Sequence, residues 1–198
     1  MDTTRLDQQM RFVAEIDRLK NIYRRTYVIA DRRHENTAEH SWHISVMAML
    51  LAEYSNQPID VLRVLKMTLI HDIVEIDAGD TFVYDAKAAA DKVERERAAA
   101  DRLFGLLPPD QAKEFRALWD EFEERLTPES RFASALDRLI PQIHNYYTEG
   151  GSWKEHQVTH DRVIAKNVTM NDGSTRLWEW AKSLLDDAVE KGYLTKKP

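Results

Sequence analysis

Apolar residues recur along this chain at the three- and four-residue spacing of α-helices. The segment 59–76 is apolar almost all round, which is typical of a helix in the middle of a bundle. The other segments with helical spacing are 4–22, 38–54, 86–104, 110–125, 129–147 and 174–191. No segment alternates between apolar and polar residues for long enough to predict a strand. The pattern therefore predicts an all-α fold.

The length of 198 residues is typical of one domain and is ample for a buried core. The chain contains no internal repeat, low-complexity tract or Pro/Gly/Ser-rich linker, so we expect a single domain over residues 1–198. Its longest apolar runs fall far short of the ~20 residues that span a bilayer, and its first ten residues contain no apolar signal-peptide core. These features predict a cytoplasmic protein with no membrane partner.

The composition excludes several kinds of chemistry. Because the chain has no cysteine, it cannot form a disulfide framework, a thiol nucleophile, a zinc ribbon or an iron–sulfur cluster. Neither the G-x-G dinucleotide fingerprint nor the Walker phosphate loop occurs among its six glycines. Any bound metal must therefore be held by nitrogen and oxygen ligands from histidine, aspartate and glutamate.

The charge is unevenly distributed. The net charge of −6 argues against binding to a nucleic-acid duplex, which needs a basic face. Residues 1–34 nevertheless carry eight basic and five acidic groups, a balance of +3. Residues 72–85 contain five carboxylates and no lysine or arginine. A bound cation would relieve the repulsion in this acidic stretch.

Three polar residues lie close together near the end of the apolar segment 59–76. His71, Asp72 and Glu75 share one face of the predicted helix, because Glu75 follows His71 by four residues and Asp72 by three. Burying carboxylates without partners costs several kcal/mol, so these groups need a cation, a hydrogen-bond network or neutralisation. A metal ion satisfies the carboxylates and also suits a neutral imidazole.

Two further polar residues occupy inward positions of predicted helices. His40 lies among apolar residues of 38–54, with Thr37 as the expected N-terminal cap, and Asp137 does so in 129–147. Taken singly, His40 could be a core histidine, and Asp137 could pair with Arg138 or Arg131. Four such residues on three helices favour a shared site. The second His-Asp pair, at 160–161, lies in a polar stretch and is predicted to be only structural.

The order of these motifs resembles that of a known family. The series EH at 39–40, HD at 71–72 and a lone aspartate at 137 is similar to that of the HD-domain metal-dependent phosphohydrolases. Within this superfamily the chain most resembles the bacterial and eukaryotic 5'-deoxynucleotidases. The matching stretches are LKNIYRRTYV, ENTAEHSWHISVMAMLLAEY, LIHDIVEIDAGD and ALDRLIPQIHN. The resemblance implies an HD-domain helical bundle around a buried metal, with a core at 5–147 and a C-terminal helical extension at 150–198.

The resemblance also implies a ligand set for the metal. One divalent ion would be bound by four residues: His40, His71, Asp72 and Asp137. Two imidazoles and two carboxylates leave coordination positions open, and they do not choose among Mn, Co, Fe, Zn and Mg. His43 and His144 are the nearest candidates for a second metal, but both are more typical of residues that support the site or the core. We therefore expect one ion.

The same resemblance assigns two residues near the metal. Glu75 matches the catalytic carboxylate that activates or positions the attacking water. Asp80 matches the residue that hydrogen-bonds the sugar 3'-hydroxyl, although an acid beside a glycine turn could equally cap the loop.

Residues upstream of the first motif would bind the substrate. Arg25 matches the phosphate-binding arginine, and Arg24 could serve after a shift of one residue. The family follows this arginine with a tryptophan that crowds the sugar 2' position, whereas this chain has Thr26 and Tyr27. Tyr27 could replace the tryptophan, so the preference between ribose and deoxyribose stays open.

These observations lead to one main functional hypothesis and two alternatives. The main hypothesis is a metal-dependent phosphomonoesterase that acts on small phosphorylated substrates, the (deoxy)nucleoside 5'-monophosphates. One alternative is a phosphodiesterase or pyrophosphohydrolase that acts on a signalling nucleotide. The other is a non-catalytic helical scaffold whose metal is structural. The resemblance also implies a homodimer.

Overall fold

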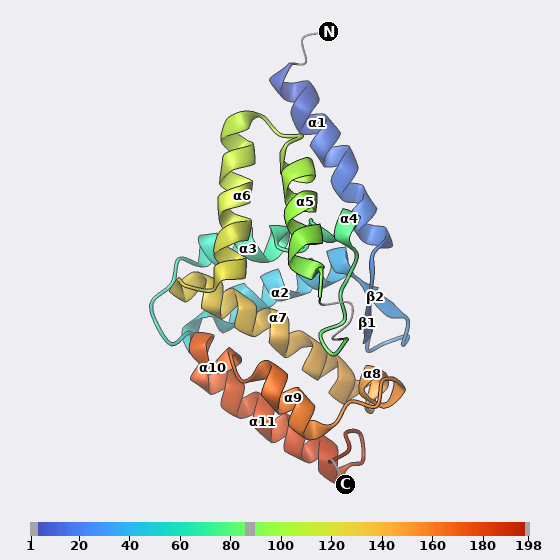
Figure 1. The fold of residues 1–198 in the computed structure, drawn as a ribbon. Helices are drawn as coiled ribbons and strands as arrows, with labels where there is room; N and C mark the ends of the chain where they lie inside the picture. The colour runs from blue at the N-terminus through green and yellow to red at the C-terminus, as the bar shows by residue number, and fades with distance from the viewer. Residues whose placement is uncertain (1–3, 86–89, 197–198) are drawn as a thin grey trace.

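The computed structural model describes residues 4–85 and 90–196 and confirms the all-α class (Figure 1). Helix α1 lies at one end of the molecule and α11 at the other, with α2, α3 and α7 between them. The α-helices are α1 (Arg5–Ile16), α2 (Thr37–Leu51), α3 (Val61–Ile70), α4 (Glu75–Ala78), α5 (Lys92–Phe104), α6 (Pro109–Glu124), α7 (Pro128–Tyr147), α8 (Gly151–Glu155), α9 (His160–Asn167), α10 (Met170–Gly173) and α11 (Thr175–Glu190). Short 3₁₀ turns at Asp17–Asn21 and Ala52–Tyr54 extend α1 and α2.

Helix α7 is the centre of the hydrophobic core. Its residue Leu136 is fully buried, as are Ile44 of α2 and Met67 of α3. A smaller apolar cluster, which includes Trp153 and Leu185, joins α8, α9 and α11. Because α10 and α11 also pack against α7, the C-terminal segment lies directly beside the helix that carries Asp137. No helix in the described parts of the chain combines the length and apolarity needed to cross a membrane.

The helices that carry the predicted ligands have well-defined starts. A reciprocal capping box between Asn36 and Glu39 begins α2. The N-cap is therefore Asn36, and the prediction of Thr37 as the cap is wrong. Thr127 and Ser130 form the corresponding box at the start of α7. Capping satisfies amide groups that have no partner within the helix. These boxes therefore define where the helices carrying His40 and Asp137 begin.

The predicted continuous helix at 59–76 is wrong. Helix α3 ends at Ile70, a turn covers residues 71–74, and the short α4 follows. In a continued helix the Thr68 carbonyl would accept the amide of residue 72, but here it lies 3.1 Å from Nδ1 of His71. The backbone then tightens, with the Glu75 amide donating to the Asp72 carbonyl three residues earlier. His71 and Asp72 thus lie on a turn.

The structure also contains one small sheet that the sequence pattern did not predict. Strands β1 (Tyr23–Tyr27) and β2 (His34–Asn36) pair antiparallel, with an irregular register between Tyr23 and Tyr27. Strands this short contain too few alternations to give a period-two signal. The hairpin places Arg24 and Arg25 beside the helical bundle. Of the predicted helix at 86–104, residues 86–89 lie outside the described part, and α5 begins at Lys92.

Candidate metal centre and active-site cavity

Four side chains that are distant in the sequence meet at the junction of α2, α3 and α7. His40 comes from α2, His71 and Asp72 from the turn after α3, and Asp137 from α7. Nε2 of His40 lies 2.9 Å from Oδ1 of Asp137 and 3.9 Å from Oδ2 of Asp72. Nε2 of His71 lies 3.1 Å from Oδ1 of Asp72 and 3.8 Å from Oδ1 of Asp137. The structure therefore brings together all four predicted ligands.

The chemistry of these side chains fits a divalent cation. Nδ1 of His71 faces a backbone carbonyl, whereas its Nε2 is buried without a hydrogen bond. This arrangement leaves Nε2 to act as a ligand. Potential ligand atoms of His40, His71 and Asp72 all lie within 4.8 Å of one another. Two imidazole nitrogens beside carboxylate oxygens form a donor set suited to several transition metals.

The local electrostatics point the same way. Burial lowers the pKa of His71, but the charges of Asp72 and Asp137 outweigh this and raise it to about 10. Burial also raises the pKa of Asp137, yet its hydrogen bond with His40 and the charge of the nearby His71 hold it well below its usual range. Carboxylates that hold a proton on an imidazole so firmly would also attract a metal cation.

The guanidinium of Arg24 lies against this cluster. It donates a 2.9 Å hydrogen bond to Asp72 and lies 3.9 Å from both Asp80 and Asp137. Burial disfavours the charged guanidinium, but the surrounding carboxylates raise the pKa of Arg24 above its usual value. Arg24, which the sequence analysis gave as the alternative to Arg25, is thus the arginine that contacts a candidate ligand.

Glu75 lies at the first residue of α4 and is only 5% exposed. Burial, reinforced by the charge of Asp72, raises the pKa of its carboxyl group well above the usual value. The Thr37 hydroxyl donates a 3.0 Å hydrogen bond to Oε2 of Glu75. Sequence reasoning assigned Thr37 only to capping, and its position next to a predicted helix start gave no other signal.

Asp80 follows the glycine that ends α4. Gly79 has φ +73°, a backbone region that glycine adopts readily. The turn directs the chain so that Asp80 lines the same cavity as Asp72 and Glu75. Burial raises the pKa of Asp80, and the charge of Arg24 opposes that rise.

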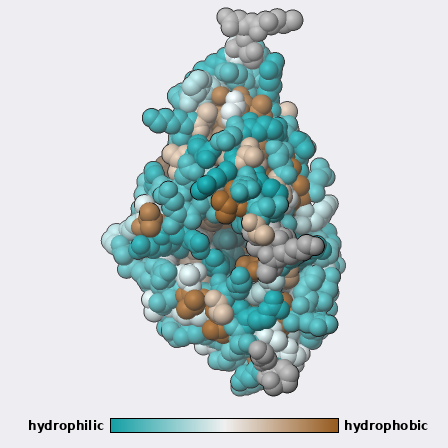
Figure 2. Space-filling model, in the orientation of Figure 1, coloured by the Kyte–Doolittle hydropathy of each residue, from teal (hydrophilic) through white to brown (hydrophobic). Residues whose placement is uncertain are grey.

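A cavity of about 310 Å³ opens beside the four candidate ligands. Figure 2 shows that the molecular face in this view is largely hydrophilic and hollowed near its middle. The cationic residues that line the cavity come from β1, α5, α7 and α9: Arg24, Arg25, Lys92, Arg138 and Lys166. Trp153 and the carboxamides of Gln142, Asn145 and Asn167 also line it. The cavity therefore offers positive charge, amide groups and an aromatic ring to a ligand.

The structure places the two predicted substrate-binding residues of the hairpin, Arg25 and Tyr27, in different surroundings. Arg25 is exposed and lines the cavity. Tyr27 is not among the residues found to line it; its hydroxyl donates a 2.6 Å hydrogen bond to Glu155, and its ring stacks on His34. Thr26 lines the cavity instead, so the structure does not bring Tyr27 together with the other candidate site residues.

The two arginines that the sequence offered as partners for Asp137 have other partners in the structure, whereas His40 is fully buried and lies within hydrogen-bond distance of Asp137. The Arg138 guanidinium donates to the carbonyl of Lys166, and the Arg131 guanidinium to the carbonyl of Arg125. Neither arginine is found paired with Asp137. The separate His-Asp pair lies on α9, where His160 is 3.3 Å from Asp186. Asp161 accepts a hydrogen bond from the Thr159 hydroxyl, and the structural role of the pair stays a prediction.

One buried carboxylate near the site was missed by the sequence analysis. Glu35 of β2 is 2% exposed, and its Oε2 lies 3.6 Å from Nδ1 of both His40 and His144. The available signal was its position five residues before His40 in HENTAEH, in a segment with no helical stripe. A single acidic residue in such a segment normally indicates a solvated turn.

This fold and this site define a class of protein. A helical bundle that buries histidines and aspartates next to a cationic cavity is suited to hold a divalent cation beside an anionic ligand. A family model described as "HD domain" matches residues 16–178. The chain therefore belongs to the HD-domain family.

Individual relatives agree with this placement. The chain is 31% identical to 5'-deoxynucleotidase HDDC2 from Danio rerio over 71% of this chain and 70% of that protein. It is 29% identical to HDDC2 from Homo sapiens, over 69% of this chain and 67% of the relative. A solved structure described as a "predicted metal-dependent phosphohydrolase" from Magnetospirillum magnetotacticum superposes with a TM-score of 0.92 and 57% identity, covering 96% of each chain.

Proposed function

We propose that this protein is a metal-dependent phosphomonoesterase that hydrolyses nucleoside or deoxynucleoside 5'-monophosphates to nucleoside and phosphate. The observation that carries the proposal is the meeting of His40, His71, Asp72 and Asp137 beside a cavity lined by cations. The names of the relatives, 5'-deoxynucleotidase and metal-dependent phosphohydrolase, support the same reaction.

In this proposal the four residues hold one divalent ion. When bound, the ion would supply a Lewis acid that lowers the pKa of water and neutralises phosphate charge. The side chains define its position because each comes from a packed element: α2, the turn after α3, and α7. Asp137 serves two histidines at once, since its Oδ1 lies 2.9 Å from His40 and 3.8 Å from His71.

Glu75 is the proposed proton carrier. The hydrogen bond from Thr37 fixes one carboxylate oxygen of Glu75, Oε2, and in this proposal the other, Oε1, contacts water. Because Glu75 also lines the cavity, its carboxyl group can reach a reacting molecule there. A general acid or base in this position contributes about 10²–10⁴-fold to a rate.

The hairpin supplies the proposed phosphate site. Arg24 and Arg25 both line the cavity, and a planar guanidinium suits the oxygens of a phosphate group. Asp80 lies 3.9 Å from Arg24 and would accept a hydrogen bond from a sugar hydroxyl. Tyr27 is not among the residues found to line the cavity, so ribose and deoxyribose substrates both belong in the test.

Two features weigh against the other hypotheses. At about 310 Å³, the cavity is near the lower end of the ~300–1,000 Å³ typical of small-molecule sites, which favours a mononucleotide over a longer substrate. A structural metal site is coordinatively closed. Here the candidate ligands Asp72 and Asp137 line an open cavity next to Glu75, which favours catalysis over a scaffold role.

The test is phosphate release from ribo- and deoxyribonucleoside 5'-monophosphates in the presence of Mn²⁺, Co²⁺ or Mg²⁺. Diesters and polyphosphorylated nucleotides serve as the comparison. We expect release from the monophosphates, and its loss in the Asp72→Ala variant. Equal release by the wild type and the variant, or no release with any of the metals, would refute the proposal.

We further infer that the protein is a cytoplasmic homodimer. Support for the dimer comes from an apolar groove of about 430 Å³ lined by Val13 and Ile16 of α1, Trp42 of α2 and Leu69 of α3. Trp42 is 64% exposed, and large exposed apolar patches mark association surfaces. Light scattering on the wild type and on Trp42→Glu tests this, with a monomeric variant expected.

A further inference from the structure

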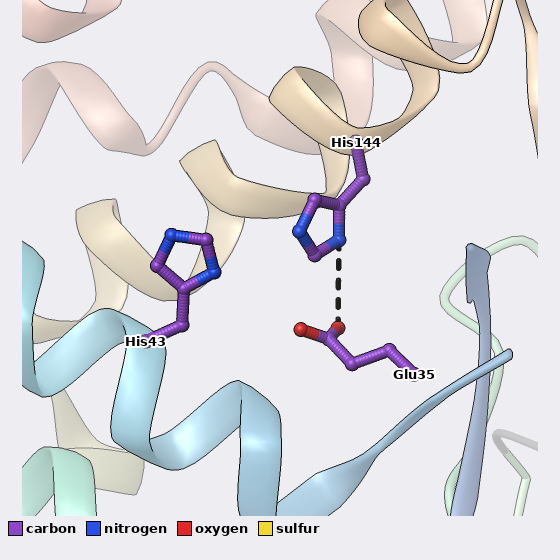
Figure 3. Close-up of side chains that lie close together, drawn as sticks. All are labelled: Glu35, His43 and His144. Carbon is purple, nitrogen blue, oxygen red and sulfur yellow. Dashed lines mark ion pairs between the residues drawn. The ribbon is translucent and has the colours of Figure 1, made fainter. Parts of the chain in front are cut away.

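Next to the candidate catalytic ligands lies a second cluster of buried donor groups. Glu35 of β2, His43 of α2 and His144 of α7 point toward one another (Figure 3). One potential ligand atom from each residue lies within 4.8 Å of those of the other two. Glu35 and His144 are buried, and His43 is half-buried. The cluster thus joins the hairpin to the two helices that carry His40 and Asp137.

The distance between Glu35 and His144 is too long for a hydrogen bond. Nδ1 of His144 is 3.6 Å from Oε2 of Glu35 and has no hydrogen-bond partner in the described structure, although it is buried. Two ligands held tetrahedrally at 2.0–2.1 Å from one ion lie about 3.4 Å apart. The separation of these two atoms therefore matches a pair of ligands better than a donor and its acceptor.

The charge of Glu35 has few compensating partners. Within residues 4–85 and 90–196, the ion-pair partners found for it are the imidazoles of His40 and His144. The Thr26 hydroxyl donates a 3.2 Å hydrogen bond to the same oxygen, Oε2. A carboxylate with 2% exposure needs positive charge nearby. Burial lowers the pKa of both His43 and His144, which favours the neutral imidazole that binds metals.

We propose that Glu35, His43 and His144 form a second divalent-cation site, separate from the one built by His40, His71, Asp72 and Asp137. Two imidazoles and one carboxylate suit Zn²⁺. The histidines come from helices α2 and α7, and the carboxylate comes from strand β2, so the ion cross-links three elements. This site does not depend on the reaction proposed above.

The position of Glu35 connects the two sites. Its Oε2 faces Nδ1 of His40 at 3.6 Å, while Nε2 of the same imidazole faces Asp137 at 2.9 Å. A cation on Glu35 and His144 would fix the carboxylate behind His40. Groups that contact the far nitrogen of a ligating histidine orient its ring. The second ion therefore has a structural role: it fixes Glu35 of the hairpin, and Glu35 orients the His40 ring.

The experiment is a zinc count on the full chain. The protein is stripped with a chelator and dialysed, Zn²⁺ is titrated by calorimetry, and the bound metal is measured after gel filtration. We expect two ions per wild-type chain, one in Asp72→Ala, one in His144→Gln and none in the double variant. Because His160 lies on α9, away from both clusters, His160→Gln is the matched control and should keep two.

A direct structural readout accompanies the count. Anomalous diffraction at the zinc edge from wild-type crystals should show a peak between Glu35, His43 and His144, and this measurement needs no variant. If His144→Gln does not fold, the half-buried His43→Gln replaces it and should lose the same peak. No peak there, or an unchanged zinc count in a folded variant, overturns the proposal whether or not the protein hydrolyses nucleotides.

Discussion

Nε2 of His40 lies 2.9 Å from Oδ1 of Asp137, although 97 residues separate them in the sequence. The contact exists because α2 and α7 pack against each other in the hydrophobic core that includes Ile44 and Leu136. His71 approaches the same carboxylate oxygen to 3.8 Å from the turn after α3. Packing of three elements thus creates the candidate metal centre.

Replacement of Glu75 should separate catalysis from metal binding. Glu75→Gln keeps the size of the side chain and an acceptor for Thr37, but it removes the proton-carrying carboxylate. We expect kcat to fall by about 10²–10⁴-fold while bound metal is unchanged. Steady-state kinetics and metal analysis measure the two quantities. Glu53→Gln, at an exposed site, is the control, and wild-type kcat in Glu75→Gln would contradict the assignment.

The two hairpin arginines should behave differently. Arg24→Ala removes the cation between Asp72, Asp80 and Asp137. It should destabilise the metal-free protein by about 3–5 kcal/mol, because buried charges are left unpaired. The metal-loaded protein should lose less, since the bound ion compensates the same carboxylates. Arg25→Ala, at an exposed position, should change stability by only about 0.5 kcal/mol.

Urea unfolding of both arginine variants, with and without metal, measures these differences. The substrate readout is kcat/KM, which should fall about 10–100-fold in Arg24→Ala if one charge-assisted hydrogen bond to phosphate is lost. Identical stability of Arg24→Ala and Arg25→Ala in chelator would show that Arg24 does not balance the buried carboxylates.

Removal of metal should lower thermal stability. A ligand present at 100 times its Kd stabilises the native state by about 2.7 kcal/mol. For a chain of this size that free energy corresponds to a fall in Tm of about 5–10 °C on chelation. Differential scanning calorimetry with and without chelator gives the value. Asp72→Ala should show a smaller fall, and an equal fall in both proteins would place the stabilising ion elsewhere.

Tyr84, which lines the cavity, should lose its phenol proton at a higher pH than a tyrosine exposed to solvent. Burial raises the pKa of its phenol to about 12. The unfolded chain loses this proton near pH 10 and the folded chain retains it, so Tyr84 should reduce stability as pH rises from about 10 to 12. The ultraviolet absorbance of tyrosinate, compared between wild type and Tyr84→Phe, measures the midpoint. A titration midpoint near pH 10 for Tyr84, the one tyrosine that the variant lacks, would contradict this expectation.

The helices could be predicted because each carries its own local signal. The spacing of apolar residues predicted the bounds of α6, α7 and α11 to within a few residues. It also predicted the described helix α5, Lys92–Phe104, as part of the segment 86–104. The same pattern marked His40, His71, Asp72 and Asp137 as polar residues in apolar surroundings. For His40 and Asp137 the inward placement follows from the helical periodicity on which the prediction was based. His71 and Asp72 lie instead on the turn after α3.

Other features depend on partners that are distant in the sequence. The hairpin has strands of five and three residues, too short for a periodic signal, and it is stabilised by pairing and by contact with α2 and α7. At the break after Ile70, the Thr68 carbonyl lies 3.1 Å from Nδ1 of the His71 ring. The roles of Glu35 and Thr37 depend on the side chains that they face. Glu35 faces His40 and His144, and Thr37 faces Glu75.

The sequence alone determined the helical class, the lack of thiol chemistry and the identity of the residues available to bind a metal. These follow from composition and from periodicity within single segments. The tertiary structure decided which arginine contacts Asp72, where Tyr27 points, and that Glu35 joins His43 and His144 in a second cluster. Such outcomes are distances between atoms on different elements, and only the packing of those elements sets them.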